Sequence, residues 1–463
     1  MKTFFTKSAL YLALTIPAFF FLGCDDSEEG GSYEFSVEPT VLTFSAKQET
    51  QTLSVRTYGD WSIVLPQDAA WLKVSAMSGR GPAEIEVTAE NYYRTDTSRT
   101  ARLTVTGGNS GDFHVEVVQR KLQMNDLSAA GKANCYIVPT SGDFVIDAAT
   151  QGNSESEQVG EWTSAELLWE DNRELITDLY GDPESKRIFF STAAAGNAVI
   201  AVKDASGKIL WSRHIWATDF DPNAKTLKYT NDNGSTWEFM DRNLGAANAE
   251  SGSFGAFGLL YQWGRKDPFT AATAFAPENP SETIRWNMLN NPLPAMASDA
   301  DSMGTVQLSI EHPTSFYVTR YAHGDWNGQP DPNLWGAVSG QKTVYDPCPA
   351  GWRVPAYDAQ GDSPYAFVTR QTTTGTDNIG RIYTDGNGND FLFPVAGSRV
   401  NGTGPLDCPG IYGSLWTATG KTTSNEDGTI EYGCLLFFTT GRLVSATYYD
   451  TRSQGVSVRC VKE

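Results

Sequence analysis

The side chains that could do chemistry in this sequence form no known catalytic pattern. None of the four histidines lies in an H-x-x-H or H-E-x-x-H spacing, so we do not expect a catalytic zinc site. The sequence contains no C-x-x-C pair, no G-x-S-x-G elbow and no phosphate-binding glycine loop. A glycosidase would need two of the 55 acidic residues about 5–10 Å apart, which sequence alone does not show. We therefore predict a protein that is not an enzyme, and an enzyme is the last of three hypotheses.

Five of the six cysteines lie beyond the amino-terminal segment, so at most two disulfide bonds can form among them. Cys348 and Cys460 bracket the carboxyl-terminal motifs. A bond between them would close a loop of about 110 residues and stabilise the fold by roughly 4–5 kcal/mol. Cys408 and Cys434 are a possible second pair, which leaves Cys135 as the free thiol. A nucleophilic role for Cys408 or Cys434 would need a lowered pKa and an accessible thiol, and we prefer the structural bridge.

Three segments near the carboxyl terminus join Gly or Pro to aromatic or β-branched residues: CPAGWRVP (348–355), GIYGSLWTAT (410–419) and GVSVRC (455–460). Together with MDRNLGA (240–246) and GLLYQWGRKDPF (258–269), they resemble the major paralogous domain of Bacteroidetes and Fibrobacter surface proteins. The resemblance covers about half of the chain and implies a variant of the C-type-lectin-like fold, but it names no activity. The residues that match the three carboxyl-terminal motifs are Cys348, Pro349, Gly351, Trp352, Arg353, Val354, Pro355, Gly413, Trp416, Thr417, Thr419, Gly455, Ser457, Val458, Arg459, Cys460, Val461 and Lys462.

A polar insert from 270 to 345 is rich in Pro, Asn, Ser and Asp and contains three tryptophans. Irregular segments of this length are usually functional or disordered, and the tryptophans argue against complete disorder. Gln329-Pro330-Asp331 resembles the galactose-reading calcium loop of C-type lectins, whose oxygens bind both Ca²⁺ and sugar hydroxyls. We take Trp326, Gln329, Asp331 and Trp335 as a candidate ligand loop, with an ordinary surface loop as the other interpretation. Apart from calcium at this loop, we expect no cofactor and no metal.

The amino terminus has the features of a secretion signal. Lys2 and Lys7 precede an apolar run that is too short for a transmembrane helix, and Cys24 follows directly after Gly23. Residues 1–23 therefore resemble a lipoprotein signal peptide, which implies lipid attachment at Cys24 and a stable membrane anchor. The acidic residues 24–32 resemble a surface-export signal of Bacteroidetes lipoproteins and would also form a solvated tether. We expect the protein to be lipid-anchored in the outer membrane and exposed on the cell surface.

Two β-rich modules come next. Seven alternating runs between residues 33 and 120 predict an immunoglobulin-like sandwich with Trp61 and Trp71 in its core. Its motifs resemble the BACON domain, for which carbohydrate or mucin binding was proposed, and we favour a spacer role. Residues 121–222 predict a second sandwich-like module, in which His214 is a core residue rather than a ligand. The BACON-like residues are Trp61, Trp71, Leu72, Lys73, Val74, Ser75, Ser78, Gly79, Asn91, Arg99, Val117, Val118 and Gln119.

The fold class predicted is mainly β, with two immunoglobulin-like sandwiches followed by an α+β, C-type-lectin-like domain at 223–463. The net charge of −20 argues against a nucleic-acid partner, since nucleic acids need basic patches. Our leading hypothesis is a non-catalytic surface adhesin or glycan-binding lipoprotein, with mucin or another polysaccharide as ligand. The second hypothesis is an accessory or tip subunit of a fimbria, which would have other fimbrial subunits as partners.

Overall fold

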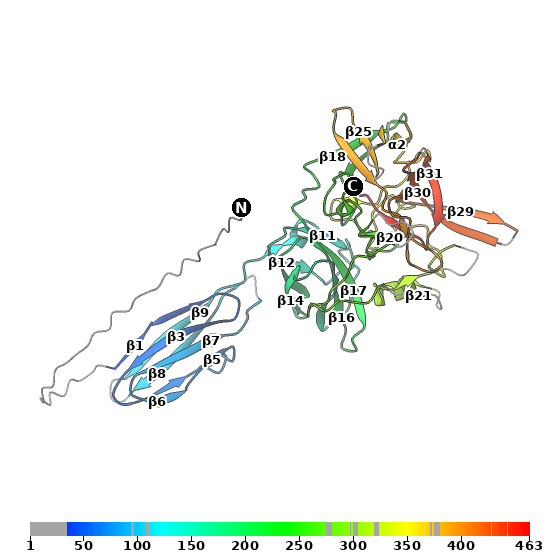
Figure 1. Cartoon of the computed structure of the whole chain (residues 1–463). Coiled ribbons are helices and arrows are strands. Elements are labelled where there is room, and N and C mark those ends of the chain that lie inside the picture. The colour runs from blue at the N-terminus through cyan, green and yellow to red at the C-terminus, as the bar shows by residue number, and fades with distance from the viewer. Residues whose placement is uncertain are drawn as a thin grey trace, which may run out of the picture. The chain divides into compact units, whose positions relative to one another are not determined.

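The computed structural model is built mainly from β-strands, as the sequence predicts (Figure 1). It describes residues 35–93, 97–107, 111–274, 280–296, 298–299, 304–318, 324–370, 373–374, 380–426, 428–441 and 443–463. The predicted signal peptide, the tether and Cys24 therefore lie outside the described residues. Within the described part, no helix has the length and apolarity that crossing a membrane requires.

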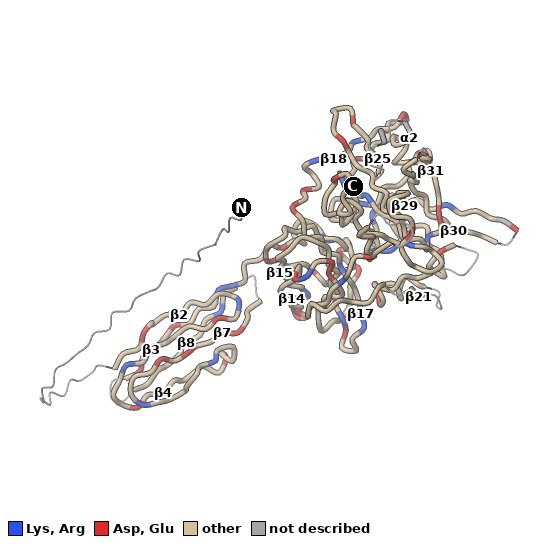
Figure 2. Tube along the Cα trace, viewed as in Figure 1, with Lys and Arg blue, Asp and Glu red and all other residues tan. Residues whose placement is uncertain are grey.

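The chain divides into two compact units, Met1–Lys121 and Leu122–Glu463. The predicted module 33–120 falls within the first unit, and the modules 121–222 and 223–463 fall in the second, except for Lys121. In each unit the acidic and basic residues are interspersed along the trace (Figure 2).

The first unit is a sandwich of two sheets, with strand orders β1-β3-β7-β5 and β2-β9-β8-β4-β6. Neighbouring strands are antiparallel, except that β2 and β9 run parallel. Buried and exposed residues alternate along β3, β7 and β8, so one face of each strand meets the core. Two of the seven predicted runs each split into two strands. The strands are β1 (Ser36–Glu38), β2 (Val41–Phe44), β3 (Glu49–Arg56), β4 (Asp60–Val64), β5 (Leu72–Val74), β6 (Ser78–Arg80), β7 (Ala83–Ala89), β8 (Arg99–Gly107) and β9 (Asp112–Gln119).

The BACON-like motif residues hold this sandwich together. Trp61 lies in the core, as predicted, and fills the space beside Gly79, where a Cβ would lie 2.4 Å from the Trp61 ring. Trp71 is only half-buried and packs at the edge of the core, so its predicted core position is only partly correct. The guanidinium of Arg99 lies 4.2 Å from the Trp71 ring centroid and donates a hydrogen bond to Gln119 Oε1.

The second unit begins with another pair of sheets, with orders β10-β12-β15-β14 and β11-β17-β16-β13. One apolar core lies between them. The sequence Asp204-Ala205-Ser206-Gly207 predicts a hairpin; it joins β16 to β17, and Gly207 takes a positive φ of 86° there. The elements are β10 (Asn125–Asp126), the 3-10 helix η1 (Leu127–Ala130), β11 (Cys135–Val138), β12 (Gly142–Asp147), β13 (Ser164–Glu170), β14 (Ile176–Asp182), β15 (Arg187–Thr192), β16 (Gly196–Lys203) and β17 (Ile209–Ala217).

The remainder of the second unit contains a sheet of order β18-β19-β33-β23 and a seven-stranded sheet of order β28-β27-β32-β29-β30-β31, in which β20 also pairs with β32. Two small sheets, β21-β22 and β24-β25-β26, complete it. The elements are β18 (Thr226–Thr230), β19 (Thr236–Met240), the 3-10 helix η2 (Phe254–Ala256), β20 (Leu260–Gln262), β21 (Ser298–Asp299), α1 (Val306–Glu311), β22 (Phe316–Tyr317), β23 (Trp352–Arg353), α2 (Phe367–Arg370), β24 (Thr373–Thr374), β25 (Gly380–Thr384), β26 (Asp390–Pro394), β27 (Ser398–Arg399), β28 (Leu406–Asp407), β29 (Tyr412–Asn425), β30 (Gly428–Thr439), β31 (Val444–Thr451), β32 (Gly455–Ser457) and β33 (Val461–Lys462).

Two local sequence signals in this region can be compared with the structure. The dipeptide Asn233-Gly234 predicts a hairpin turn; it joins β18 and β19, and Gly234 takes a positive φ of 86°. Ser363-Pro364 predicts the start of a short helix through Arg370; the observed helix is shorter, because a turn precedes α2 (Phe367–Arg370). The largest apolar cluster contains residues from both predicted modules of this unit, among them Trp169, Trp216, Trp263 and Trp416.

Candidate functional site

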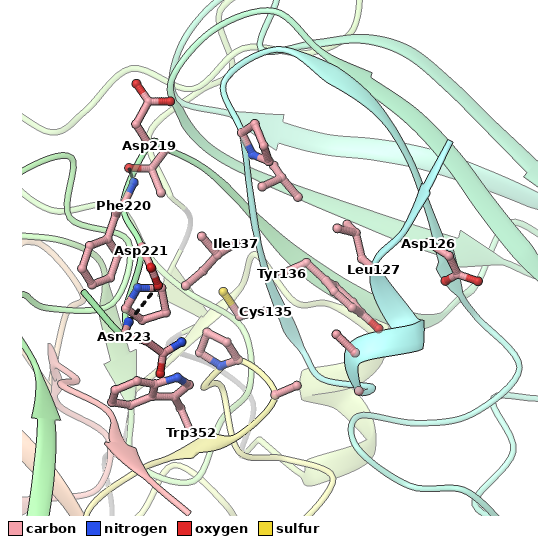
Figure 3. Close-up of a pocket in the computed structure, with 18 residues that line it drawn as sticks. Asp126, Leu127, Cys135, Tyr136, Ile137, Asp219, Phe220, Asp221, Asn223 and Trp352 are labelled. Atoms are coloured by element: carbon pink, nitrogen blue, oxygen red, sulfur yellow. Dashed lines mark hydrogen bonds between the residues drawn. The ribbon is translucent and has the colours of Figure 1, made fainter. Parts of the chain in front are cut away.

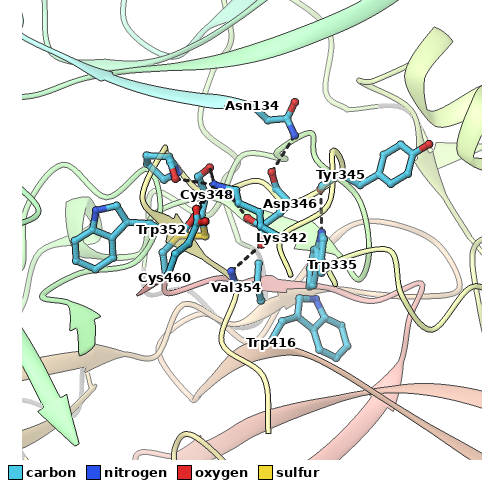
Figure 4. The surroundings of a disulfide bond; sticks show 12 residues. Asn134, Trp335, Lys342, Tyr345, Asp346, Cys348, Trp352, Val354, Trp416 and Cys460 are labelled. Atoms are coloured by element: carbon cyan, nitrogen blue, oxygen red, sulfur yellow. Dashed lines mark hydrogen bonds and ion pairs between the residues drawn. A yellow bond between two sulfur atoms is a disulfide. The ribbon is translucent and has the colours of Figure 1, made fainter. Parts of the chain in front are cut away.

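Cys348 and Cys460 form the predicted disulfide bond, with their Cα atoms 6.0 Å apart (Figure 4). Both cysteines are fully buried. The bond holds the CPAGWRVP segment against β33, which also pairs with β23 and β19. The buried ammonium of Lys342 donates hydrogen bonds to the carbonyl oxygens of Cys348, Pro349 and Trp352. The disulfide bond and the Lys342 hydrogen bonds together form a buried centre that holds the end of the chain in place. These contacts stabilise the fold.

The carboxylate of Asp346 completes the same centre. It accepts the backbone N–H of Cys348 at 2.8 Å and that of Val354 at 2.9 Å (Figure 4). Burial raises its pKa from 3.8 to about 6. Asn134 from the preceding sandwich donates to the backbone carbonyl of Asp346 at 2.9 Å, so the two halves of the second unit share this hydrogen-bond network.

The predicted bridge between Cys408 and Cys434 is wrong, because both thiols are free. Cys408 is partly exposed and donates to its neighbour Asp407, whereas Cys434 is buried on β30 opposite Tyr449. Cys135 is free and buried, as expected. Burial raises the pKa of all three thiols, so none has the lowered pKa of an activated nucleophile.

The predicted ligand loop is not assembled as a site. Trp326 and Trp335 are almost completely buried, because each indole N–H finds a backbone carbonyl: Trp326 donates to Trp263 at 2.7 Å, and Trp335 donates to Arg265 at 3.2 Å. Both tryptophans belong to the core and cannot stack on a ligand. Gln329 and Asp331 are exposed, and Asp331 lines a polar cleft of about 410 Å³. Among the described residues, no three His, Cys, Asp or Glu side chains gather where they could hold a metal ion.

His214 is a core residue, as predicted. Its Nε2 lies 3.0 Å from Oδ1 of Asn197, whose amide nitrogen donates to Asp171 and to the Gly245 carbonyl. The Asn197 oxygen therefore accepts the hydrogen bond, and the histidine carries its proton on Nε2. Burial lowers the pKa of His214 from 6.5 to about 3, so the ring is neutral at physiological pH. A neutral ring enclosed in this way supports packing rather than catalysis.

An exposed row of aromatic rings crosses the outer strands of the seven-stranded sheet. We call it the aromatic row, and its members in spatial order are Tyr412, Phe437, Tyr448, Tyr449 and Tyr432. The successive ring centroids lie 5.5, 4.9, 6.2 and 4.9 Å apart. The exposed fractions of Tyr448 and Tyr449 are 43% and 39%, and the other three rings are half-buried. Aromatic rings that form a contiguous surface in this way often mark a binding site.

Strand geometry brings these rings together. Tyr448 and Tyr449 are consecutive residues of β31, which is the outermost strand of its sheet (Figure 1). Neighbouring residues of a strand normally point to opposite faces. Tyr448 pairs with Leu435 and Tyr449 pairs with Cys434 in regular register, and the pairing of β30 with β31 shifts only beyond them, between Leu435 and Phe437. On this edge strand both tyrosine rings are nevertheless exposed, and they stack at an interplanar angle of 24°.

Polar groups accompany the aromatic row. The hydroxyl of Tyr412 donates to Asp407 Oδ2 at 2.9 Å and lies 2.8 Å from the Ser398 hydroxyl. At the other end, the ammonium of Lys421 lies 3.8 Å from the ring centroid of Tyr449. The surface therefore combines apolar ring faces with hydroxyl, carboxylate and ammonium groups at its margin.

A separate cleft of about 630 Å³ runs beside strand β11, in the sandwich that begins the second unit (Figure 3). Its walls are β11, the 3-10 helix η1 with the residues around it, the segment 218–223, and Pro349, Ala350 and Trp352. The lining contains no histidine, and the one cysteine that lines it is the buried Cys135. Three aspartates, Asp126, Asp219 and Asp221, also line it.

Comparison with known proteins identifies one part of the chain. Residues 61–120 match the family model described as "BACON: Putative binding domain, N-terminal", which confirms a BACON domain in the first unit. No curated protein matches the chain.

Solved structures resemble only portions of the chain. A GH5 xyloglucanase of Bacteroides ovatus, solved with a XXXG heptasaccharide, is 25% identical over 23% of this chain and 27% of its own, with a TM-score of 0.18. A Bacteroides thetaiotaomicron protein solved by NMR is 19% identical over 22% of this chain and all of its own, with a TM-score of 0.16. The E. coli chaperone DraB is 11% identical over 39% of this chain and 96% of its own, with a TM-score of 0.17. TM-scores this low establish no shared overall fold.

Proposed function

We propose that this protein is a non-catalytic lipoprotein of the outer cell surface that binds glycans through the aromatic row. The observation that carries the proposal is the continuous series of ring contacts from Tyr412 to Tyr432, in which Tyr448 and Tyr449 are exposed and the other three rings are half-buried. A pyranose ring presents a face of C–H bonds that packs on an aromatic ring, while its hydroxyl groups point outward to polar partners. Several rings in succession suit an oligosaccharide better than a single sugar.

The polar groups of the row favour a glycan over an apolar protein partner. Four of the five rings are tyrosines, so each apolar face has a hydroxyl group at its end. Asp407 and Lys421 add a hydrogen-bond acceptor and a donor at the two ends. Sugar hydroxyls need both kinds of partner, whereas a purely apolar interface would leave these groups without partners.

The rest of the architecture fits a surface protein. Within this proposal Cys24 carries the lipid anchor, the acidic residues 24–32 form the tether, and the BACON domain is a spacer or a second binding domain. The carboxyl-terminal region would be the C-type-lectin-like domain that presents the row, with no cofactor. An accessory role in a fimbria is the second candidate function, and the open side of strand β11 favours it because an unpaired strand can accept another chain.

A glycan array probed with the purified protein tests the proposal. The array should include mucin O-glycans and plant polysaccharides, and the protein should be compared with a variant carrying Tyr448→Ala and Tyr449→Ala. The matched control is Tyr180→Ala, because Tyr180 has a similar exposed fraction of 38% but lies on β14. We expect the double variant to bind a recognised glycan at least tenfold more weakly, which corresponds to about 1.4 kcal/mol.

Two results would count against the proposal. One is an absence of binding to every glycan on the array. The other is equal loss of binding in the double variant and in Tyr180→Ala, which would place the site elsewhere. The lipid anchor has a separate test: metabolic labelling with a radioactive fatty acid should mark the wild-type protein and not Cys24→Ala.

A further inference from the structure

We infer that the cleft beside strand β11 binds an extended segment of another polypeptide that carries basic residues next to apolar ones. This site is separate from the aromatic row and does not depend on glycan binding. The inference rests on the backbone geometry of β11, the apolar walls of the cleft and the carboxylates at its mouth.

Strand β11 is the terminal strand of its sheet, with β17 as its parallel neighbour. Asn134 and Val138 direct their carbonyl oxygens to that neighbour, accepting the N–H groups of His214 at 2.7 Å and Thr218 at 2.8 Å. Backbone groups of successive residues point to alternate sides of a strand, so the N–H and C=O of Ile137 point away from β17, toward the cleft.

The chain itself begins to cover this open side and then leaves it. Cys135 forms an isolated parallel bridge with Pro349, and the next residues turn away toward β23. In the described part of the chain, no strand continues the pairing along Ile137. A short extended segment could therefore continue where Pro349 departs, which is the geometry of strand addition.

The walls of the cleft suit apolar side chains. Ile137 and Phe220 face the cleft from opposite sides, and Trp352 lies at one end of it (Figure 3). Ile137 and Phe220 are only partly buried, so each has apolar surface left to cover. Edge strands usually carry a charged residue or a proline that prevents pairing. Within β11 no residue is charged or a proline, and Pro139, which also lines the cleft, follows only at the end of the strand.

The charges at the mouth decide which segment fits. Asp219 and Asp221 are exposed at the rim, and within the described residues no ion pair engages either carboxylate. The nearby cation Arg242 stacks on Phe220, and its charge is offset by Asp241 at 2.8 Å. A segment with Lys or Arg beside its apolar residues would complement this rim.

The same charges argue against two other occupants. The chain's own amino-terminal tail carries the acidic run DDSEE, which would be repelled by the rim. A second copy of this protein, with a net charge of −20, is also an unfavourable partner. The occupant is therefore a segment of a different, locally basic polypeptide.

A phage-displayed library of random heptapeptides, selected on the purified full-length protein, tests the inference. Ile137→Lys serves as the counter-selection protein, since a cation there would repel a basic peptide and fill the cleft. We expect enriched peptides to carry Lys or Arg together with apolar residues at alternate positions. A synthetic copy of an enriched peptide should bind Ile137→Lys at least tenfold more weakly by calorimetry, and Ile137→Val about as well as wild type.

Two further measurements keep the inference testable if Ile137→Lys folds poorly. The double variant with Asp219→Asn and Asp221→Asn, both at exposed positions, should bind the peptide at least threefold more weakly at low salt. The double variant with Tyr448→Ala and Tyr449→Ala should bind the peptide as tightly as the wild-type protein. N-methylation of the peptide amide that pairs with Ile137 should abolish binding. Enrichment of acidic peptides, no enrichment over the counter-selection protein, or full binding by the Asn variant would each overturn the inference.

Discussion

The ammonium nitrogen of Lys342 lies 2.9 Å from the carbonyl oxygen of Cys348, and it also lies 2.7 Å from that of Pro349 and 2.5 Å from that of Trp352. Its side chain is only 3% exposed. One residue at the end of the polar insert therefore satisfies three carbonyl groups of the CPAGWRVP segment. This contact explains how an irregular insert can be an integral part of the carboxyl-terminal fold.

Lys342→Met should destabilise the second unit strongly. The variant keeps the apolar stem but removes the ammonium donor from three carbonyl oxygens, of which only that of Pro349 also accepts the backbone N–H of Trp352; this loss should cost about 3 kcal/mol. Urea denaturation followed by tryptophan fluorescence measures the change. Lys208→Met is the control, because Lys208 pairs with Glu311 at the surface, and its unfolding midpoint should hardly move. Equal midpoints for the two variants would contradict a structural role for Lys342.

His214 should make the protein less stable as the pH falls. Its folded pKa is about 3 and its unfolded pKa about 6.5, so between these values the unfolded state binds a proton that the folded state does not. The contribution of the neutral His214 to the free energy of unfolding is fully present above pH 6.5. It is lost as the pH falls below this value, by at most about 1.4 kcal/mol per pH unit. Asp171 and Asp346 act in the opposite direction between about pH 6 and pH 4, because burial raises their pKa values to about 6.

Comparison with His214→Gln isolates the histidine from these carboxylates. The glutamine amide can still donate to Asn197 but does not titrate. We expect the unfolding free energy of wild type, relative to the variant, to fall by about 2 kcal/mol between pH 6.5 and pH 4.5. Urea denaturation at the two pH values measures this difference, and parallel pH dependence of the two proteins would rule out a neutral buried imidazole.

Arg99 should be irreplaceable by lysine in the first unit. Its guanidinium lies 4.2 Å from the ring centroid of Trp71 and 4.4 Å from that of Tyr92, and it donates to Gln119. Lysine has no planar group that could stack between two rings and at the same time donate a hydrogen bond to Gln119 from its edge. Arg99→Lys should cost about 2 kcal/mol of unfolding free energy, whereas Arg102→Lys, at an exposed pair with Glu116, should stay within about 0.5 kcal/mol. Comparable losses would mean that the stacking contributes little.

The sequence predicts the features that depend on neighbouring residues and misses those that depend on distant ones. The hairpin at Asn233-Gly234 follows from local turn chemistry and is confirmed. Trp326 and Trp335 lie in a polar stretch, which suggested exposed side chains. They are buried because their N–H groups find carbonyls 63 and 70 residues away, a relationship that no local pattern contains.

The aromatic row shows the same limit. The run CLLFFTTGRLVSATYY predicts strands of an antiparallel sheet, and β30 and β31 confirm it. Which of its rings are exposed depends on which residues of β30 and β31 pair with each other and on β31 being the outermost strand of its sheet. Both properties come from pairing between separate segments. A pair of adjacent tyrosines within an alternating strand was the one local signal that could have drawn attention to this surface.

The three free thiols within the described residues, Cys135, Cys408 and Cys434, should differ in reactivity. Cys408 is partly exposed, whereas Cys135 and Cys434 are 1% and 6% exposed. Alkylation requires both access and a thiolate, and burial raises the pKa of all three thiols. In the folded protein, iodoacetamide at pH 7.5 should label Cys408 slowly and the other two at least about 100-fold more slowly, since those need a local opening of the fold. Mass spectrometry of proteolytic fragments measures the labelling at each position.

The control for this experiment is the same reaction in urea, where Cys135, Cys408 and Cys434 should all react at similar rates. Cys348 and Cys460 should remain unlabelled under both conditions until a reductant is added, because their sulfur atoms are bonded to each other. If Cys408 and Cys434 were bridged, neither would react in urea without reductant. That outcome would restore the second disulfide which the sequence suggested and the structure lacks.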